Sequence, residues 1–181
     1  MNTGRILVAD VDNVPILKFV GDVRVLMSGT LDNYFSSLYS KAILDRMIVD
    51  MTETDGIDST ALGLIAKMAI QLRNRFNVSP TIVSTNPDIT RILRSMSFDL
   101  ICNIVEEPGA RKTGVSNKVD NDTEGNNVKA TAKEFDELKQ LNDSEEAVRQ
   151  KVIEAHQTLM TLSDENRLEF QDLVSALKAN R

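Results

Sequence analysis

The sequence predicts an α/β domain followed by a helical extension. Between residues 47 and 105, short apolar runs of strand length alternate with longer segments whose apolar residues recur every three or four positions. Such an alternation is typical of a largely parallel sheet joined by right-handed crossovers. Residues 107–127 are then almost free of apolar side chains, and amphipathic segments follow them. We therefore predict a mixed sheet of about five strands with helices, and an all-helical C-terminal extension.

The first two predicted strands form a hairpin. The runs 6–11 and 15–20 are rich in β-branched and other apolar residues, and Asp12-Asn13-Val14 between them favours a tight turn. Three further runs of the same character predict strands at 47–51, 81–84 and 100–105.

Three helices are predicted between these strands. The segment 30–43 has one apolar face, and the segment 60–75 has a wider one, so both are expected to pack on the sheet. A third helix follows Asn86, which is a good N-cap residue. Pro87 and Asp88 then suit the first turn of a helix.

Changes in composition predict three parts: a domain at 1–107, a flexible linker at 108–129 and a helical extension at 130–181. The extension is expected to be helical throughout 131–179, as three helices with breaks near residues 142 and 163. Its apolar faces must be buried, because most helical stability comes from tertiary packing. They can pack on each other, on the first domain, on a second copy of the chain or on a partner.

The bulk properties favour a cytoplasmic protein that binds other proteins. The net charge of −6 argues against a nucleic-acid partner, because that affinity comes from Lys and Arg. Cys102 is the only cysteine and is expected to be a buried thiol in a reducing compartment. The N-terminus has no secretory signal pattern, and no apolar run approaches the roughly 20 residues that span a bilayer.

No catalytic, cofactor or metal site is predicted, so the protein is not expected to be an enzyme. A nucleophilic Ser59 would need a histidine, and the only one is His156, far along the chain beyond the predicted linker. One His and one Cys cannot form a zinc site, and EF-hand spacing is absent. Neither of the glycine-rich motifs that hold nucleotide phosphates occurs.

The segment 57–65, Ile-Asp-Ser-Thr-Ala-Leu-Gly-Leu-Ile, places the hydroxyl of Ser59 where a strand ends and a helix begins. One interpretation is a helix cap, since Ser, Thr and Asp are all capping residues. Another is a modification site, and the two can coexist. The small residues Ala61 and Gly63 would allow the backbone of a partner to approach closely. A phosphate on Ser59 would add about −1.5 to −2 charges. Because acidic residues lie nearby in the sequence, it would repel a docked protein and cause release.

Several segments together resemble a known family. They are Gly21-Asp22, Met47-Ile48-Val49-Asp50-Met51, the segment Ile57 to Gly63, Asn86-Pro87 and Met96-Ser97-Phe98. Over about residues 4–107 the chain resembles a STAS domain, most closely that of the bacterial anti-sigma-factor antagonists (anti-anti-sigma factors). The resemblance implies a STAS-like sheet and a role in transcription regulation.

The resemblance also implies partners and site residues. Ser59 would be phosphorylated by a partner that is both an anti-sigma factor and a serine kinase, and the unphosphorylated form would bind that partner. A serine phosphatase of the metal-dependent class would remove the phosphate, and the C-terminal helices could bind a second effector. Besides Ser59, the site residues implied as partner-binding are Asp22, Arg24, Asp58, Thr60, Ala61 and Gly63.

Two positions depart from the family pattern. Arg24 reverses the charge of the aspartate that often ends the Gly-Glu-Leu-Asp segment, and Ala61 replaces a glycine of the serine loop. STAS-like domains also serve as structural or regulatory subunits of transport or signalling complexes, in which the serine need not be phosphorylated. That role is the alternative prediction.

Overall fold

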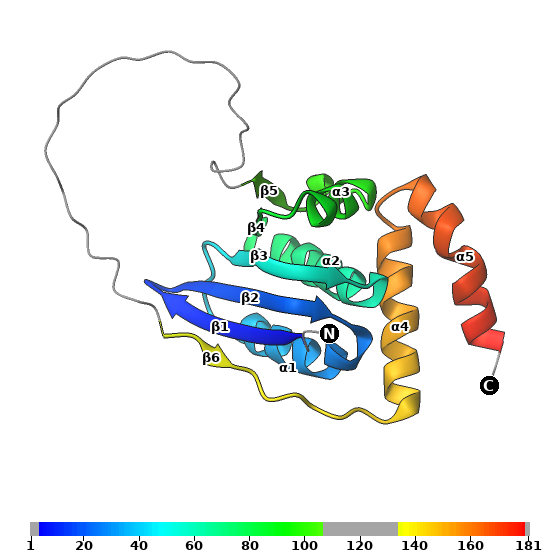
Figure 1. Cartoon of the computed structure of the whole chain (residues 1–181), viewed down its shortest axis with the longest axis horizontal. Helices are drawn as coiled ribbons and strands as arrows, with labels where there is room; N and C mark the ends of the chain where they lie inside the picture. Colours follow the sequence, from blue (N-terminus) through cyan, green and yellow to red (C-terminus); the bar gives the residue numbers. More distant parts are fainter. Residues whose placement is uncertain (1–3, 107–133, 180–181) are drawn as a thin grey trace, which may run out of the picture.

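The computed structural model of the chain describes residues 4–106 and 134–179, and its centre is a six-stranded sheet with the order β5-β4-β3-β2-β1-β6 (Figure 1). The strands are β1 (Arg5–Val11), β2 (Val14–Val23), β3 (Ile48–Ile57), β4 (Thr81–Ser84), β5 (Asn103–Glu106) and β6 (Asp136–Glu137). The α-helices are α1 (Ser28–Tyr39), α2 (Ser59–Phe76), α3 (Pro87–Ser95), α4 (Glu145–Met160) and α5 (Asp164–Ala179). The predicted mixed sheet with helices is thereby confirmed.

The predicted hairpin is formed by β1 and β2, which pair antiparallel. The two residues between them, Asp12 and Asn13, have φ angles of 52° and 64°. Positive φ at both central positions defines the turn whose twist matches that of the flanking strands. Asn and Asp tolerate this conformation better than other residues with a side chain, so the local sequence determines the hairpin.

Strands β2, β3, β4 and β5 are parallel, and each lies next to the one before it in the chain. Because every step along the sheet has the same direction, right-handed crossovers place α1, α2 and α3 on one face. Side chains from these helices and from that face of the sheet form one continuous hydrophobic core. The face carries Leu17 and Phe19, neither of which is exposed to solvent.

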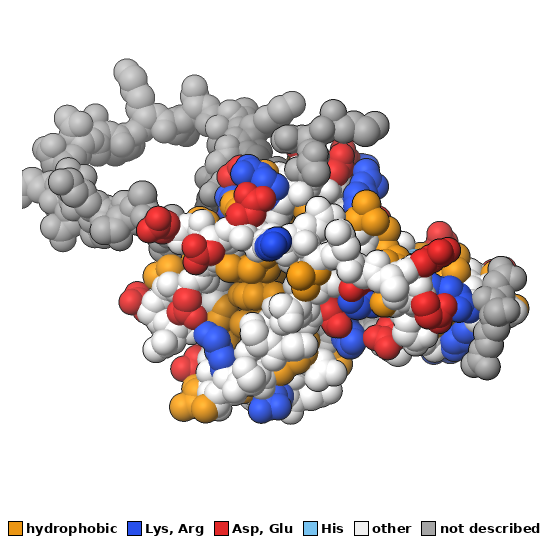
Figure 2. Space-filling model, turned by 90° about the horizontal axis from the view of Figure 1, so that it is seen from below, with side chains coloured by type: hydrophobic (Ala, Val, Ile, Leu, Met, Phe, Trp, Pro, Cys, Tyr) orange, Lys and Arg blue, Asp and Glu red, His pale blue; other side chains and the backbone are white. Residues whose placement is uncertain are grey.

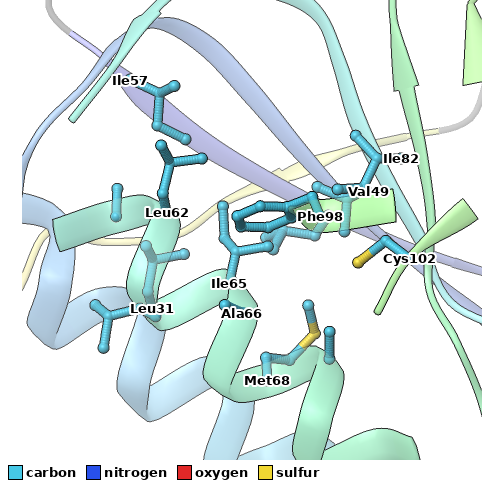
Figure 3. Close-up of a cluster of buried hydrophobic side chains, with 14 of the residues drawn as sticks. Leu31, Val49, Ile57, Leu62, Ile65, Ala66, Met68, Ile82, Phe98 and Cys102 are labelled. Carbon is cyan, nitrogen blue, oxygen red and sulfur yellow. The ribbon is translucent and has the colours of Figure 1, made fainter. Parts of the chain in front are cut away.

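Figure 3 shows the centre of this core. Phe98 lies among Ile65 of α2, Val49 of β3 and Ile82 of β4, and Cys102 is close by. The predicted burial of Cys102 is confirmed, since the residue is 5% exposed. Burial raises the pKa of its thiol to about 12, with Arg73 acting in the opposite direction. The thiol is therefore protonated near neutral pH.

The predicted fifth strand starts too early. Ser97 adopts a φ of 62°, and Phe98–Leu100 form a 3₁₀ turn before β5 begins at Asn103. This turn buries the ring of Phe98 completely. Because a buried turn and a buried strand both give a short apolar run, the apolar residues at 100–102 could not show which of these two structures forms. A second 3₁₀ turn, Val25–Met27, precedes α1, which starts at Ser28 and ends at Tyr39.

Within residues 134–179 the extension forms two helices and one short strand. The prediction of helix at 131–141 is wrong for the described residues from 134 onwards, because Asp136 and Glu137 form β6. They pair with Leu7 and Val8 of β1, and the amide of Leu138 donates to the carbonyl of Ile6 at 2.9 Å. An edge strand such as β1 offers unpaired backbone groups, and this pairing replaces local helix formation.

The helices α4 and α5 are antiparallel neighbours, and α4 packs on α2 (Figure 1). Of the packing alternatives for the extension, the structure therefore shows two: its helices pack on each other and on the first domain. The predicted linker at 108–129 lies outside the described residues. No helix in the described ranges is both long and apolar enough to cross a membrane.

Candidate functional site at the start of α2

The junction between β3 and α2 is held by Asp58. Its carboxylate accepts hydrogen bonds from the amide of Ala61 at 2.8 Å and from the amide of Val25 at 2.6 Å. Asp58 has extended backbone angles and is the N-cap of α2, so Ser59 is the first helical residue. The capping role therefore belongs to Asp58, and the hydroxyl of Ser59 is free to bond elsewhere.

The hydroxyl of Ser59 bonds to a histidine of the extension. Its Oγ lies 2.8 Å from Nε2 of His156 in α4. The other ring nitrogen, Nδ1, lies 2.7 Å from the carbonyl oxygen of Val152. Because a carbonyl only accepts, Nδ1 carries a hydrogen; in the neutral ring Nε2 is then the acceptor, and Ser59 donates. His156 is 2% exposed, and its ring meets that of Phe170 in α5 edge to face, with centroids 4.9 Å apart.

One turn further along α2, Gly63 meets the backbone of α4. A Cβ atom at Gly63 would clash with the main-chain carbonyl of Ala155 and would lie 2.6 Å from the Cβ of that alanine. Two helices reach such proximity only where both residues are small. The sequence predicted that a partner backbone could approach here; in this structure the chain's own α4 takes that place. Figure 1 shows α4 crossing the end of the sheet at which β2 and β3 finish, with α5 outside it.

Charged side chains of the extension pair near this crossing, one with the domain and one within the extension. Lys67 of α2 pairs with Glu154 of α4 at 3.0 Å. The carboxylate of Asp143 lies against Gly29 at the start of α1 and pairs with Lys151 at 2.8 Å. The end of the molecule that carries α4 and α5 bears charged side chains of both signs (Figure 2).

A buried asparagine fixes the other end of α4. The side-chain amide of Asn166 in α5 donates to the carbonyls of Met96 and Leu159, each at 3.0 Å. Asn166 is 2% exposed. Both of its acceptors are main-chain groups near helix ends. The carbonyl of Met96 at the end of α3 is a group that needs an external donor, whereas that of Leu159 also accepts from the amide of Leu162. The residue therefore joins α5, the end of α4 and the end of α3.

The residues implied as partner-binding fall into two groups. Asp22 and Arg24 form an ion pair at 3.2 Å at the surface, at the end of β2. They are close to Asp58, whose amide donates to the carbonyl of Val23 at 3.1 Å. Three others, Thr60, Ala61 and Gly63, are buried. In this arrangement Asp22 and Arg24 are open to a partner, whereas Asp58 and Ser59 are only partly exposed and the hydroxyl of Ser59 is bonded to His156. The partner role of all these residues stays a prediction.

Sequence reasoning missed His156. The argument that its place beyond the linker separates it from Ser59 is wrong, because the extension folds back on the domain. The signal was present: His156 follows Val152 by four residues and precedes Leu159 by three, so it lies on the apolar face that these two residues mark in the sequence. Asn166 and Phe170 gave no comparable signal for their specific contacts.

The Ser59–His156 pair is not by itself a catalytic arrangement. The group that orients the ring is a main-chain carbonyl of Val152, which cannot balance the charge of an imidazolium as the carboxylate of a triad does. Within residues 4–106 and 134–179, no three His, Cys, Asp or Glu side chains gather as a metal site would require. The absence of enzymatic activity stays a prediction.

Residues 5–109 match the family model of the STAS domain. No curated protein sequence is a significant match. A structure named as a candidate anti-sigma factor antagonist from Thermotoga maritima has 22% sequence identity and a TM-score of 0.44, covering 54% of this chain and 82% of its own. An uncharacterised protein from Shewanella loihica with a SpoIIAA-like fold has 15% identity and a TM-score of 0.43, covering 60% and 88%.

Proposed function

Because the chain belongs to the STAS domain family, we propose that it is an anti-sigma-factor antagonist that acts by partner switching. In its unphosphorylated form it binds an anti-sigma factor that is also a serine kinase. Phosphorylation of Ser59 by that kinase releases the chain, and a serine phosphatase of the metal-dependent class restores the binding form. The protein works in the cytoplasm, regulates transcription and catalyses no reaction of its own.

The observation that carries this proposal is the place of Ser59 within the matched domain. Its hydroxyl stands on the first residue of α2, and the neighbouring Asp58 does the capping. A hydroxyl that is not needed for capping can be modified without loss of the helix start. The open carboxylate–guanidinium pair of Asp22 and Arg24 lies beside it and gives a charged rim for a protein partner.

The charges around Ser59 support release on phosphorylation. A phosphate there gains from the amides at the helix N-terminus. Asp58 adjoins it, and Asp55 is exposed on the preceding strand. A dianion added to this acidic junction changes the potential of the docking surface by more than any single substitution of a neutral residue. A partner adapted to the neutral hydroxyl then loses affinity.

The experiment is capture of native partners by full-length chains carrying wild-type Ser59, Ser59→Ala or Ser59→Asp, with mass spectrometry of Ser59. We expect an anti-sigma factor with a kinase domain to bind wild type and alanine and not aspartate, and a phosphate on a fraction of wild-type Ser59. Ser36→Asp is the matched control, because Ser36 is an exposed serine of α1 that bonds only to its own helix.

The opposite result has a definite meaning. Identical partners for all four chains, together with an unmodified Ser59, would contradict partner switching. Stable co-purification with a transport ATPase would then favour the structural subunit role.

A further inference from the structure

The extension covers part of the site that the proposed function assigns to Ser59, which stays partly exposed. The hydroxyl oxygen bonds to His156, which is itself almost completely buried between α2 and Phe170. Phosphoryl transfer needs the acceptor oxygen in line with the leaving group of the nucleotide. The imidazole of His156 occupies one approach to that oxygen, and a phosphate bound to Ser59 would need space that the ring now fills.

The same helix covers the neighbouring surface of α2. Gly63 and Ala155 are in direct contact, so no other backbone can approach Gly63 while α4 is in place. A partner that docks on this surface would have to present a helix with a small residue opposite Gly63, as α4 does. Partner and extension therefore require the same surface.

The contact near Ser59 is suited to separation. It consists of a hydroxyl, an imidazole, a glycine and an alanine, with the Lys67–Glu154 pair at its edge. These groups bury little apolar area, and a partly exposed ion pair adds only a small stabilisation. The larger apolar contacts of the extension, from Leu159 and Phe170, lie with the main core and determine most of the cost of displacement.

We propose that α4 is a displaceable shield: it occupies the surface at which Ser59 meets its kinase and its binding partner, and both can act only when α4 moves away. The identity of those partners rests on the proposed function. The shielding itself is a property of this chain alone, so it can be tested without any partner.

The test measures access to position 59 in the full-length chain. Ser59→Cys is labelled with iodoacetamide, and the rates at the introduced thiol and at the native Cys102 are followed by mass spectrometry. A second chain adds Ala155→Arg, which forces α4 away from Gly63. A third adds Gln157→Arg instead, which places the same charge on an exposed position of α4. Should Ala155→Arg fail to fold, Glu154→Lys replaces it, because it sets two lysines against each other.

We expect the introduced thiol at position 59 to react slowly with wild-type α4 and with Gln157→Arg, and about tenfold faster or more with Ala155→Arg. Cys102 should stay unreactive in every chain, because it is buried in the sheet core. A neighbouring imidazole favours the reactive thiolate, so loss of His156 from the site would by itself slow the reaction. A faster reaction therefore reports access.

Two results would overturn the shield. An introduced thiol that already reacts as fast with wild-type α4 as with Ala155→Arg would mean that the site is open. Cys102 that becomes reactive in step with the introduced thiol would mean that α4 leaves only when the whole domain unfolds. Neither result bears on whether Ser59 variants change partner capture, so failure of the shield and failure of the proposed function are distinguishable.

Discussion

Ser59 and His156 are 97 residues apart in the sequence, and their side chains are 2.8 Å apart in the structure. One belongs to the STAS domain and the other to the extension. Their bond therefore joins the proposed modification site to the part of the chain that the family model does not match. Any change that moves α4 changes the surroundings of Ser59 directly.

Replacing Gly63 by alanine tests the packing of α4 on α2, because it affects the stability of α2 itself and the contact with α4 in opposite directions. Alanine favours a helix over glycine by about 1 kcal/mol, so α2 alone would be stabilised. The added methyl would clash with the backbone of Ala155, and overpacking typically costs about 1–3 kcal/mol. We expect a net loss of roughly 1 kcal/mol in the free energy of unfolding, and faster amide exchange in α4 than in α2.

Gln71→Ala is the matched control for this change, because Gln71 is exposed on the same helix. It should alter the free energy of unfolding by less than about 0.5 kcal/mol. A stabilised Gly63→Ala protein with unchanged exchange in α4 would show that α4 does not pack on Gly63 in solution.

Replacing Asp58 tests how the start of α2 is held. Asp58→Ala removes the acceptor for the amides of Ala61 and Val25. Losing an N-cap costs about 1 kcal/mol, and the second charge-assisted bond adds a similar amount. We expect a total loss of about 2 kcal/mol in urea denaturation, and a smaller one for Asp58→Asn, which keeps an acceptor oxygen. Asp55→Ala, at an exposed position nearby, should be close to neutral; equal losses for Asp55 and Asp58 would contradict the capping role.

The elements of the first domain were predictable because their signals are local. The turn residues Asp12 and Asn13, the cap Asn86 and the apolar faces of α1 and α2 each determine a neighbouring segment. The place of Ser59 at the start of a helix followed from the same kind of signal. The bond to His156 was not predictable in this way, because it depends on how α4 docks after a long insertion. The strand β6 was missed because its partner is an edge strand far away in the sequence.

Replacing Asn166 tests the attachment of α5. Asn166→Leu is similar in size and removes the donor to both carbonyls. The carbonyl of Leu159 keeps the amide of Leu162 at 3.0 Å, so the main loss falls on the partly buried carbonyl of Met96. Each unsatisfied buried group costs about 1–3 kcal/mol. We expect a loss of roughly 1–2 kcal/mol in the free energy of unfolding, and faster amide exchange in α5. Gln171→Ala, at an exposed position of the same helix, should have little effect. Exchange in α5 as slow as in wild type would show that the asparagine does not hold it.

The pair of Lys18 and Asp50 predicts the pH dependence of stability. Burial raises the pKa of Asp50, but hydrogen bonds from Thr52 and Lys18 outweigh it, so the pKa lies below its ordinary value of 3.8. Burial lowers the pKa of Lys18, but its bonds to Glu53 and Asp50 outweigh it, so the pKa lies above 10.5. Asp50, whose pKa is lowered, contributes stability above pH 3.8. This stability is lost as the pH falls through the pKa of Asp50 in the folded protein. Lys18, whose pKa is raised, contributes stability below pH 10.5. This stability is lost as the pH rises through the pKa of Lys18 in the folded protein.

Asp50→Asn should therefore cost roughly 1 kcal/mol at pH 7. The cost should fall progressively below the ordinary value of 3.8, because the carboxylate is protonated first in the unfolded chain and at lower pH in the folded one. Urea denaturation at about pH 7, 5 and 3 measures the difference. Asp10→Asn is the control, because the pair of Asp10 with Lys41 is more exposed than that of Asp50 with Lys18. It should lower the free energy of unfolding by less at neutral pH. If the Asp50→Asn loss stayed constant down to the acidic end of this range, the cost would come from packing or hydrogen bonding of the amide, and the charge of Asp50 would not be the stabilising feature.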